Sequence, residues 1–99
     1  MTLDPWLKAH IRLAILQVMD LDAGNSVNHV ILAHALERTR AYSLADEEIK
    51  EYLAWLEGRD LVVTEDVGRY RIARLTEDGE RAARGMKVVA GVARADPRD

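Results

Sequence analysis

The chain has 99 residues, enough for one domain, with a globular balance of 48% hydrophobic and 31% charged residues. Its net charge of −3 lacks the basic surplus of most nucleic-acid binders, although residues 59–99 hold nine basic and eight acidic residues. Cysteine is absent, which excludes disulfides, thiolate metal sites and cysteine nucleophiles.

The first predicted helix begins after Asp4, a good N-cap, with Pro5 at the first helical position. Apolar residues then recur at helical spacing, at Leu7, Ile11, Ala14, Ile15 and Val18. Trp6, Leu13 and Leu16 widen this apolar surface beyond one stripe. Such a helix is either central to the core or covered by a partner.

Two further helices are predicted between residues 26 and 58. Residues 20–25 stop the first helix, and Ser26 then caps a second one that runs to about Arg40. Ser43 caps a third helix, with Asp46 as its capping-box partner, and Gly58 ends that helix.

The hydrophobic period changes after residue 58. A β-branched run at 61–64, a turn signal at 65–68 and an alternating segment at 69–75 predict a β-hairpin. Thr76 caps a short fourth helix that ends near Gly85. We therefore expect one α+β domain over residues 1–85 and a tail over 86–99 that is either flexible or an interface arm.

Two motifs in this order resemble the winged-helix transcriptional regulators. The stretch 53–62, Leu-Ala-Trp-Leu-Glu-Gly-Arg-Asp-Leu-Val, is similar to the end of their recognition helix and the opening of their wing. The segment 75–79, Leu-Thr-Glu-Asp-Gly, is similar to their closing motif. The resemblance implies a winged helix-turn-helix fold, with three helices, a β-hairpin wing and a short C-terminal helix.

A closer resemblance is to small winged-helix proteins of Mu-like phages and prophages. It is carried by residues 4–16, by Leu-Ala-Trp-Leu at 53–56, by the turn at 65–68 and by Gly-Val at 91–92. Those proteins are often grouped with regulators of the arsenic-repressor type. This chain lacks the cysteine motif of that family, so metal sensing is not carried over.

The predicted recognition helix is acidic where a DNA reader is usually basic. It carries Lys50 against five carboxylates, at Asp46, Glu47, Glu48, Glu51 and Glu57. Carboxylates that approach phosphates are repelled, so this face is either solvated or docked on a basic protein.

The wing is the better candidate for contacting DNA phosphates, through Arg69, Tyr70, Arg71 and Arg74. Arg69 and Arg71 are predicted to share one strand face. The alternative is that these charges protect an edge strand from aggregation. Weaker DNA-binding candidates are Lys50, Arg81 and Arg84.

No catalytic or metal-binding pattern is present. His29 and His34 are five residues apart, which does not align them on one helix face, and His10 stands alone. We interpret all three as boundary histidines, and we expect no metal, no cofactor and no enzymatic activity.

Two functions stay open on this sequence. The first is a phage or prophage DNA-binding or regulatory protein that contacts duplex DNA through its wing. The second is a protein-interaction module, such as an accessory or assembly factor, that does not bind DNA. The surplus apolar surface also suggests a homodimer, with candidate interface residues Trp6, Leu13, Leu16 and Val89. No signal peptide or membrane span is evident, so we expect no membrane partner and a location in the cytoplasm of the bacterial host.

Overall fold

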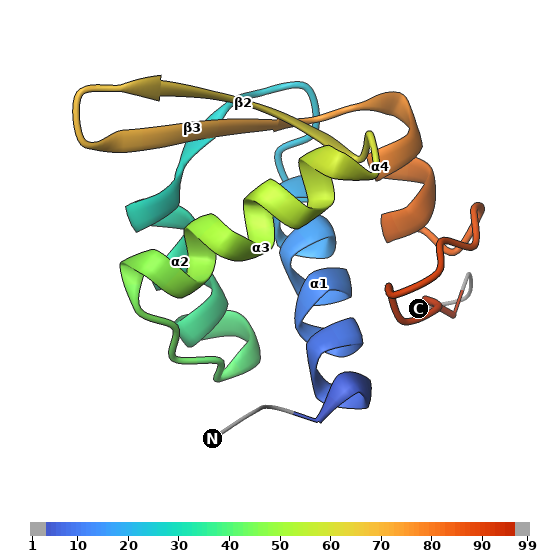
Figure 1. Ribbon diagram of the computed structural model, residues 1–99. Coiled ribbons are helices and arrows are strands. Elements are labelled where there is room, and N and C mark those ends of the chain that lie inside the picture. The colour runs from blue at the N-terminus through green and yellow to red at the C-terminus, as the bar shows by residue number, and fades with distance from the viewer. Residues whose placement is uncertain (1–3, 97–99) are drawn as a thin grey trace.

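A computed structural model describes residues 4–96, which form an α+β domain (Figure 1). The elements of this part of the chain are, in order, α1 (Pro5–Asp20), β1 (Val27–Asn28), α2 (His29–Arg40), α3 (Asp46–Gly58), β2 (Val62–Val67), β3 (Tyr70–Leu75) and α4 (Glu77–Ala83). The three strands form one antiparallel sheet in the order β1-β3-β2.

Helix α1 is the central element of the core. It begins as predicted, with Asp4 Oδ1 accepting a hydrogen bond of 2.7 Å from the Trp6 backbone N–H. Figure 1 shows α2 on one side of α1 and α4 with the C-terminal segment on the other, while α3 crosses in front of α1. The width of its apolar surface therefore reflects burial from several directions within one chain.

The sequence did not predict β1, a strand of two residues that pairs Val27 with Ala73 and Asn28 with Ile72. This pairing makes β3 the central strand at residues 72 and 73, so the interpretation of 69–75 as an edge strand is wrong at these two positions, and β2 is an edge. The cap of α2 is also different. Asn28 Oδ1, rather than Ser26, accepts a 2.9 Å hydrogen bond from Ile31 N, because Ser26 lies before the short strand.

Helix α3 starts two residues later than a Ser43 cap requires. Ala45 is its N-cap, and Glu48 Oε1 accepts a 3.0 Å hydrogen bond from the Ala45 N–H. The helix ends at Gly58 as predicted. The left-handed residue of the corner that follows is Asp60, with φ of 62°.

The hairpin turn is shorter than predicted. Residues 65–67 belong to β2, and only Gly68 and Arg69 connect Val67 to Tyr70. Gly68 adopts a φ of +59°, which glycine reaches without steric cost. Beyond the hairpin, Thr76 caps α4 as expected, and its Oγ1 accepts a 3.0 Å hydrogen bond from Gly79 N.

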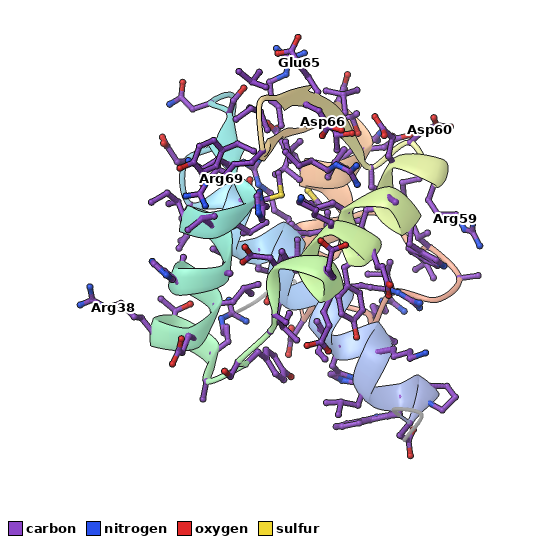
Figure 2. All side chains as sticks on the ribbon, turned by 60° about the vertical axis from the view of Figure 1, so that its left-hand side comes forward. Arg38, Arg59, Asp60, Glu65, Asp66 and Arg69 are labelled. Atoms are coloured by element: carbon purple, nitrogen blue, oxygen red, sulfur yellow. The ribbon has the colours of Figure 1, made fainter. Side chains whose placement is uncertain are left out.

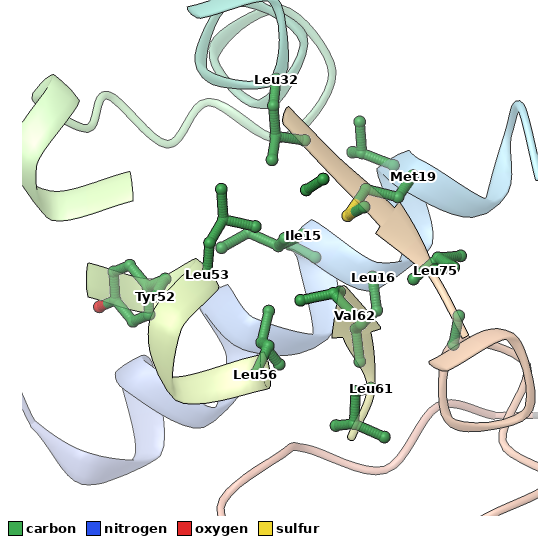
Figure 3. Packing of buried hydrophobic residues seen from close by; sticks show 14 of the residues in the cluster. Ile15, Leu16, Met19, Leu32, Tyr52, Leu53, Leu56, Leu61, Val62 and Leu75 are labelled. Atoms are coloured by element: carbon green, nitrogen blue, oxygen red, sulfur yellow. The ribbon is translucent and has the colours of Figure 1, made fainter. Parts of the chain in front are cut away.

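The core lies between the sheet and the helices, and every helix contributes to it (Figure 3). Its largest fully buried apolar side chains are Ile15, Leu16, Leu32, Leu36, Ile49, Leu53, Leu56, Leu61 and Val62. Leu61 and Val62 place the start of β2 directly against the helices, which anchors the hairpin.

Residues 86–96 pack against the domain, although the sequence placed 86–99 outside it. Ala93 N donates a 3.0 Å hydrogen bond to Ala9 O, and Arg12 Nη1 donates one of 3.0 Å to Gly91 O. Val89 and Val92 are partly buried against the core. The tail therefore covers α1 within the same chain, while an interface role of this segment stays a prediction.

Candidate interaction surface on α3 and the β2–β3 hairpin

The guanidinium group of Arg71 is hydrogen-bonded to other residues of the protein. It lies opposite Asp66, on the face of the sheet that is turned to α3. Its Nε donates to Asp66 Oδ1 at 3.0 Å, and its Nη1 donates to the Lys50 carbonyl at 3.3 Å. Hydrogen bonding to Asp66 raises the pKa of Arg71 and lowers the pKa of Asp66. The guanidinium thus joins the hairpin to α3 and is largely occupied.

Arg69 occupies the two-residue turn, so the prediction that it shares a strand face with Arg71 is wrong. Its Nη2 donates a 2.9 Å hydrogen bond to the Tyr70 hydroxyl, and its guanidinium lies 4.8 Å from the centre of that ring. The Tyr70 contact raises the pKa of Arg69, with a smaller contribution from Asp46 on α3. Arg69 is exposed, yet an α3 carboxylate offsets part of its field.

Arg74 is the candidate that points freely into solvent. It lies opposite Val63 and makes no side-chain hydrogen bond or ion pair with any residue from 4 to 96. It belongs to the face of the sheet that is turned away from the buried residues Ala73 and Leu75.

Of the weaker DNA-binding candidates, Arg84 is paired with an acid among the described residues, whereas Arg81 and Lys50 are not. Arg84 makes two 3.0 Å hydrogen bonds to Asp20, which raise the pKa of Arg84 and tie α4 to the end of α1. Arg81 is exposed and has no side-chain partner within the described chain. Lys50 is half-buried beside the hairpin. Since Arg71 and Arg84 are paired with acids, the exposed arginines among the candidates that have no acidic partner within residues 4–96 are Arg69, Arg74 and Arg81.

The exposed surface of α3 carries most of its carboxylates. Glu48 is occupied by the N-cap, and Glu57 accepts hydrogen bonds of 2.8 Å from both the N–H and the hydroxyl of Thr64. The side chains of Asp46, Glu47 and Glu51 are exposed, although Asp46 Oδ2 also lies 3.7 Å from His29 Nε2. We call these three residues the α3 acidic face.

His29 is buried, which differs from the boundary position expected for it. The residue is 2% exposed, and its Nδ1 accepts a 3.1 Å hydrogen bond from Arg71 N. Its Nε2 lies 3.7 Å from Asp46 Oδ2. This histidine satisfies the backbone of β3 beyond the end of β1. Sequence spacing gave no signal for it, because its partners lie 42 and 17 residues away.

The family of the chain is shown by one similar protein, since no family model matches the chain. The chain is 31% identical over 87 residues to "Uncharacterized protein gp26" of Escherichia phage Mu, with 88% of each protein covered. The chain belongs to the gp26 family. The expected phage resemblance is therefore confirmed at the level of a phage Mu relative.

The gp26-family chain also resembles a solved structure, that of AF1382 from Archaeoglobus fulgidus. The TM-score is 0.57 at 23% sequence identity, over 73% of this chain and 75% of the archaeal one. At this identity the match shows a shared fold and nothing about activity. Within residues 4–96, no helix is long and apolar enough to cross a membrane, and no group of three or more His, Asp or Glu residues could hold a metal ion.

The candidate interface residues of this gp26-family chain differ in how far they are exposed. Leu13 and Leu16 are 8% and 0% exposed, so they serve its own fold, and the prediction that they form an interface is wrong for this conformation. Val89 is partly buried in the same way. Trp6 is 66% exposed, with its ring 3.9 Å from that of His10. The surplus apolar surface of α1 is thus covered mainly by the rest of the chain.

Proposed function

We propose that this gp26-family chain is a non-catalytic winged-helix domain that docks on a protein partner through the α3 acidic face. The winged-helix assignment is supported by the order of elements: α2 and α3 are separated by five residues, and the β2–β3 hairpin follows α3 as a wing. In such a domain, α3 takes the position of the helix that otherwise enters a DNA groove.

The observation that carries the proposal is the charge of this helix and its surroundings. The α3 acidic face carries three exposed carboxylates, while the nearest wing cations are engaged by Asp66 and Tyr70. Phosphate contacts supply most of the affinity for DNA, so a negative helix surface opposes binding in the groove. The same surface fits a partner that presents lysine or arginine side chains.

DNA contact through the wing is the second candidate function. It is favoured by Arg74 and Arg81, which have no acidic partner in the described part of the chain, and by the exposure of Arg69. These cations could bind phosphates without insertion of α3 into a groove. Such binding would be independent of sequence and strongly dependent on salt.

One titration experiment distinguishes the two functions. Amide chemical shifts of the labelled protein are recorded with a random duplex of about 20 base pairs, and separately with a lysine-rich helical peptide, from about 50 to 200 mM salt. We expect no shifts with the duplex, and with the peptide we expect shifts confined to α3. Glu47→Gln with Glu51→Gln should weaken peptide binding several-fold, because the attraction between charges is removed.

The matched control changes the same number of charges elsewhere, with Glu37→Gln and Glu77→Gln, and should bind the peptide as the wild type does. Shifts of wing residues with the duplex, lost in Arg69→Ala with Arg74→Ala, would favour DNA contact instead. Equal peptide binding by both acidic double variants would contradict docking through α3.

A further inference from the structure

Most of one face of the sheet is left uncovered by the described helices, except at its hairpin end, where the Tyr70 ring lies 6.1 Å from the ring of His29 at the start of α2. The register places Val63, Glu65 and Val67 of β2 opposite Arg74, Ile72 and Tyr70 of β3, so these six residues share one face, which we call the outer sheet face. The helices all lie on the opposite side of the sheet (Figure 1). Figure 2 shows Glu65 pointing away from the helices, into solvent.

The outer sheet face exposes apolar side chains beside its charged ones. Val63 and Val67 are 42% and 55% exposed. A hollow of about 210 Å³ opens beside Val63, and its lining mixes apolar with polar and charged side chains: Ser26, Val63, Thr64, Glu65, Ile72, Ala73 and Arg74. Exposed apolar side chains that gather on one side of a sheet are typical of a contact surface.

The charges on this face are of opposite sign and are unpaired. Neither Glu65 nor Arg74 makes an ion pair or a side-chain hydrogen bond with any described residue. They lie at opposite corners of the register, since Glu65 faces Ile72 while Arg74 faces Val63. Val63 and Ile72 occupy the other two corners of the same four-residue set.

We propose that the outer sheet face binds the same face of a second copy of this chain in a two-fold dimer. A two-fold interface must be complementary to itself, and a face with one acid, one base and apolar side chains beside them meets this condition. Glu65 of each copy then pairs with Arg74 of the other, while the valine and isoleucine side chains pack between the two sheets. DNA fits this face less well, because Glu65 repels phosphate and Val63 and Val67 offer it no polar contact.

This dimer is independent of the proposed docking through α3. The α3 acidic face lies on another side of the molecule and stays exposed in both copies. A contact limited to one small sheet buries less than the roughly 800 Å² per partner of a standard stable interface. We therefore expect weak association, populated at tens to hundreds of micromolar protein.

Sedimentation equilibrium from about 10 µM to 1 mM protein tests the dimer. The wild type should approach twice its monomer mass as its concentration rises. Arg74→Glu and Glu65→Arg should each weaken dimerisation at least tenfold, because each variant places like charges opposite one another. An equimolar mixture of the two single variants should associate again, and so should the double variant, because complementary charges are restored in both.

Matched controls change the same charges on α4, with Glu77→Arg and with Arg81→Glu, and should dimerise like the wild type. Circular dichroism establishes that each variant is folded. A monomer at every concentration would overturn the proposal. A dimer that Arg74→Glu leaves unchanged would also overturn it. So would amide chemical shifts of the outer sheet face that change on addition of duplex DNA but not with protein concentration.

Discussion

At the scale of single residues, the pairing of charges decides which cations are available to a partner. Arg71 and Arg84 look like surface charges in the sequence, but each makes two hydrogen bonds to a carboxylate, those of Asp66 and Asp20. Asp66 and Arg71 are the second cross-strand pair from the two-residue turn, so their pairing follows from the register alone. A turn placed over 65–68 hides this pairing, because it removes Asp66 from the strand.

The Asp66–Arg71 pair predicts a dependence of stability on pH. Hydrogen bonding to Arg71 lowers the pKa of Asp66 in the folded state. The pair therefore stabilises the fold above the unfolded-state pKa of aspartate, about 3.9, and this contribution is lost as the pH falls through the folded pKa. In Arg71→Gln, we expect the pKa of Asp66 to rise toward its ordinary value, as followed by NMR titration of the carboxyl carbon.

Arg81→Gln is the control for this titration, since it removes an arginine that does not contact Asp66. An unchanged Asp66 midpoint in Arg71→Gln would show that the hydrogen bond is not formed in solution.

At the scale of elements, the junction of the hairpin with α4 is closed by backbone contacts. Thr76 N donates a 3.1 Å hydrogen bond to Leu61 O, and the Thr76 hydroxyl donates one of 2.7 Å to Asp60 O. Gly79 lies against the same Leu61 carbonyl, and a Cβ at this position would collide with it. The resemblance to the Leu-Thr-Glu-Asp-Gly motif thus has a packing reason, namely the close approach of α4 to the start of β2.

Two glycine-to-alanine changes in helices should have opposite effects. Gly79→Ala should destabilise the domain by about 1–3 kcal/mol, because the added methyl group overpacks the junction. Gly58→Ala should stabilise it by about 0.5–1 kcal/mol, because no atom lies within 4 Å of the added Cβ and alanine favours the helix. Urea unfolding followed by circular dichroism measures both. Equal effects of the two changes would contradict the packing at Gly79.

At the scale of the whole molecule, the C-terminal segment closes the domain over α1 and α3. Trp55 lies between two guanidinium groups, with the Arg12 carbon 3.9 Å and the Arg59 carbon 4.5 Å from its ring centre. Gly91 lies on the edge of the same ring, with a φ of +89°. Arg12 binds both the ring and the Gly91 carbonyl, so this one side chain joins α1, α3 and the tail.

The closure of the tail is tested by two glycines whose φ angles are nearly equal. A Cβ at Gly91 would lie 2.6 Å from Trp55 Cζ2, whereas a Cβ at Gly24, where φ is +90°, would meet no atom within 4 Å. Both alanine variants should lose about 1 kcal/mol from backbone strain. Gly91→Ala should lose a further 1–3 kcal/mol, approximately, because the tail is pushed off the ring. Thermal unfolding measures both losses.

In a Trp6→Phe background, Gly91→Ala should also shift the Trp55 fluorescence to longer wavelength, since displacement of the tail admits water to the ring. The Gly24→Ala control should leave the spectrum unchanged. The same stability loss for both glycines, without a spectral shift, would mean that the tail does not rest on Trp55.

The sequence by itself determined the helices, the hairpin and their order. These features depend on local signals, such as the Asp4-Pro5 start, the Thr76 cap and the change of hydrophobic period near residue 60. The acidity of α3 was also evident from the sequence, because charge is a property of composition. The resemblance to phage proteins was also evident from the sequence, because it is carried by short continuous segments of the chain.

Only the tertiary structure decided the features that join distant parts of the chain. The strand β1 is two residues long and exists because β3 offers it partners, so no periodicity could reveal it. The burial of Leu13 and Leu16, the pairing of Arg84 with Asp20 and the contact of Gly91 with Trp55 each link residues that are far apart in sequence. The outer sheet face became visible only once the register was fixed, because a strand's pattern shows which residues alternate and not which side the helices cover.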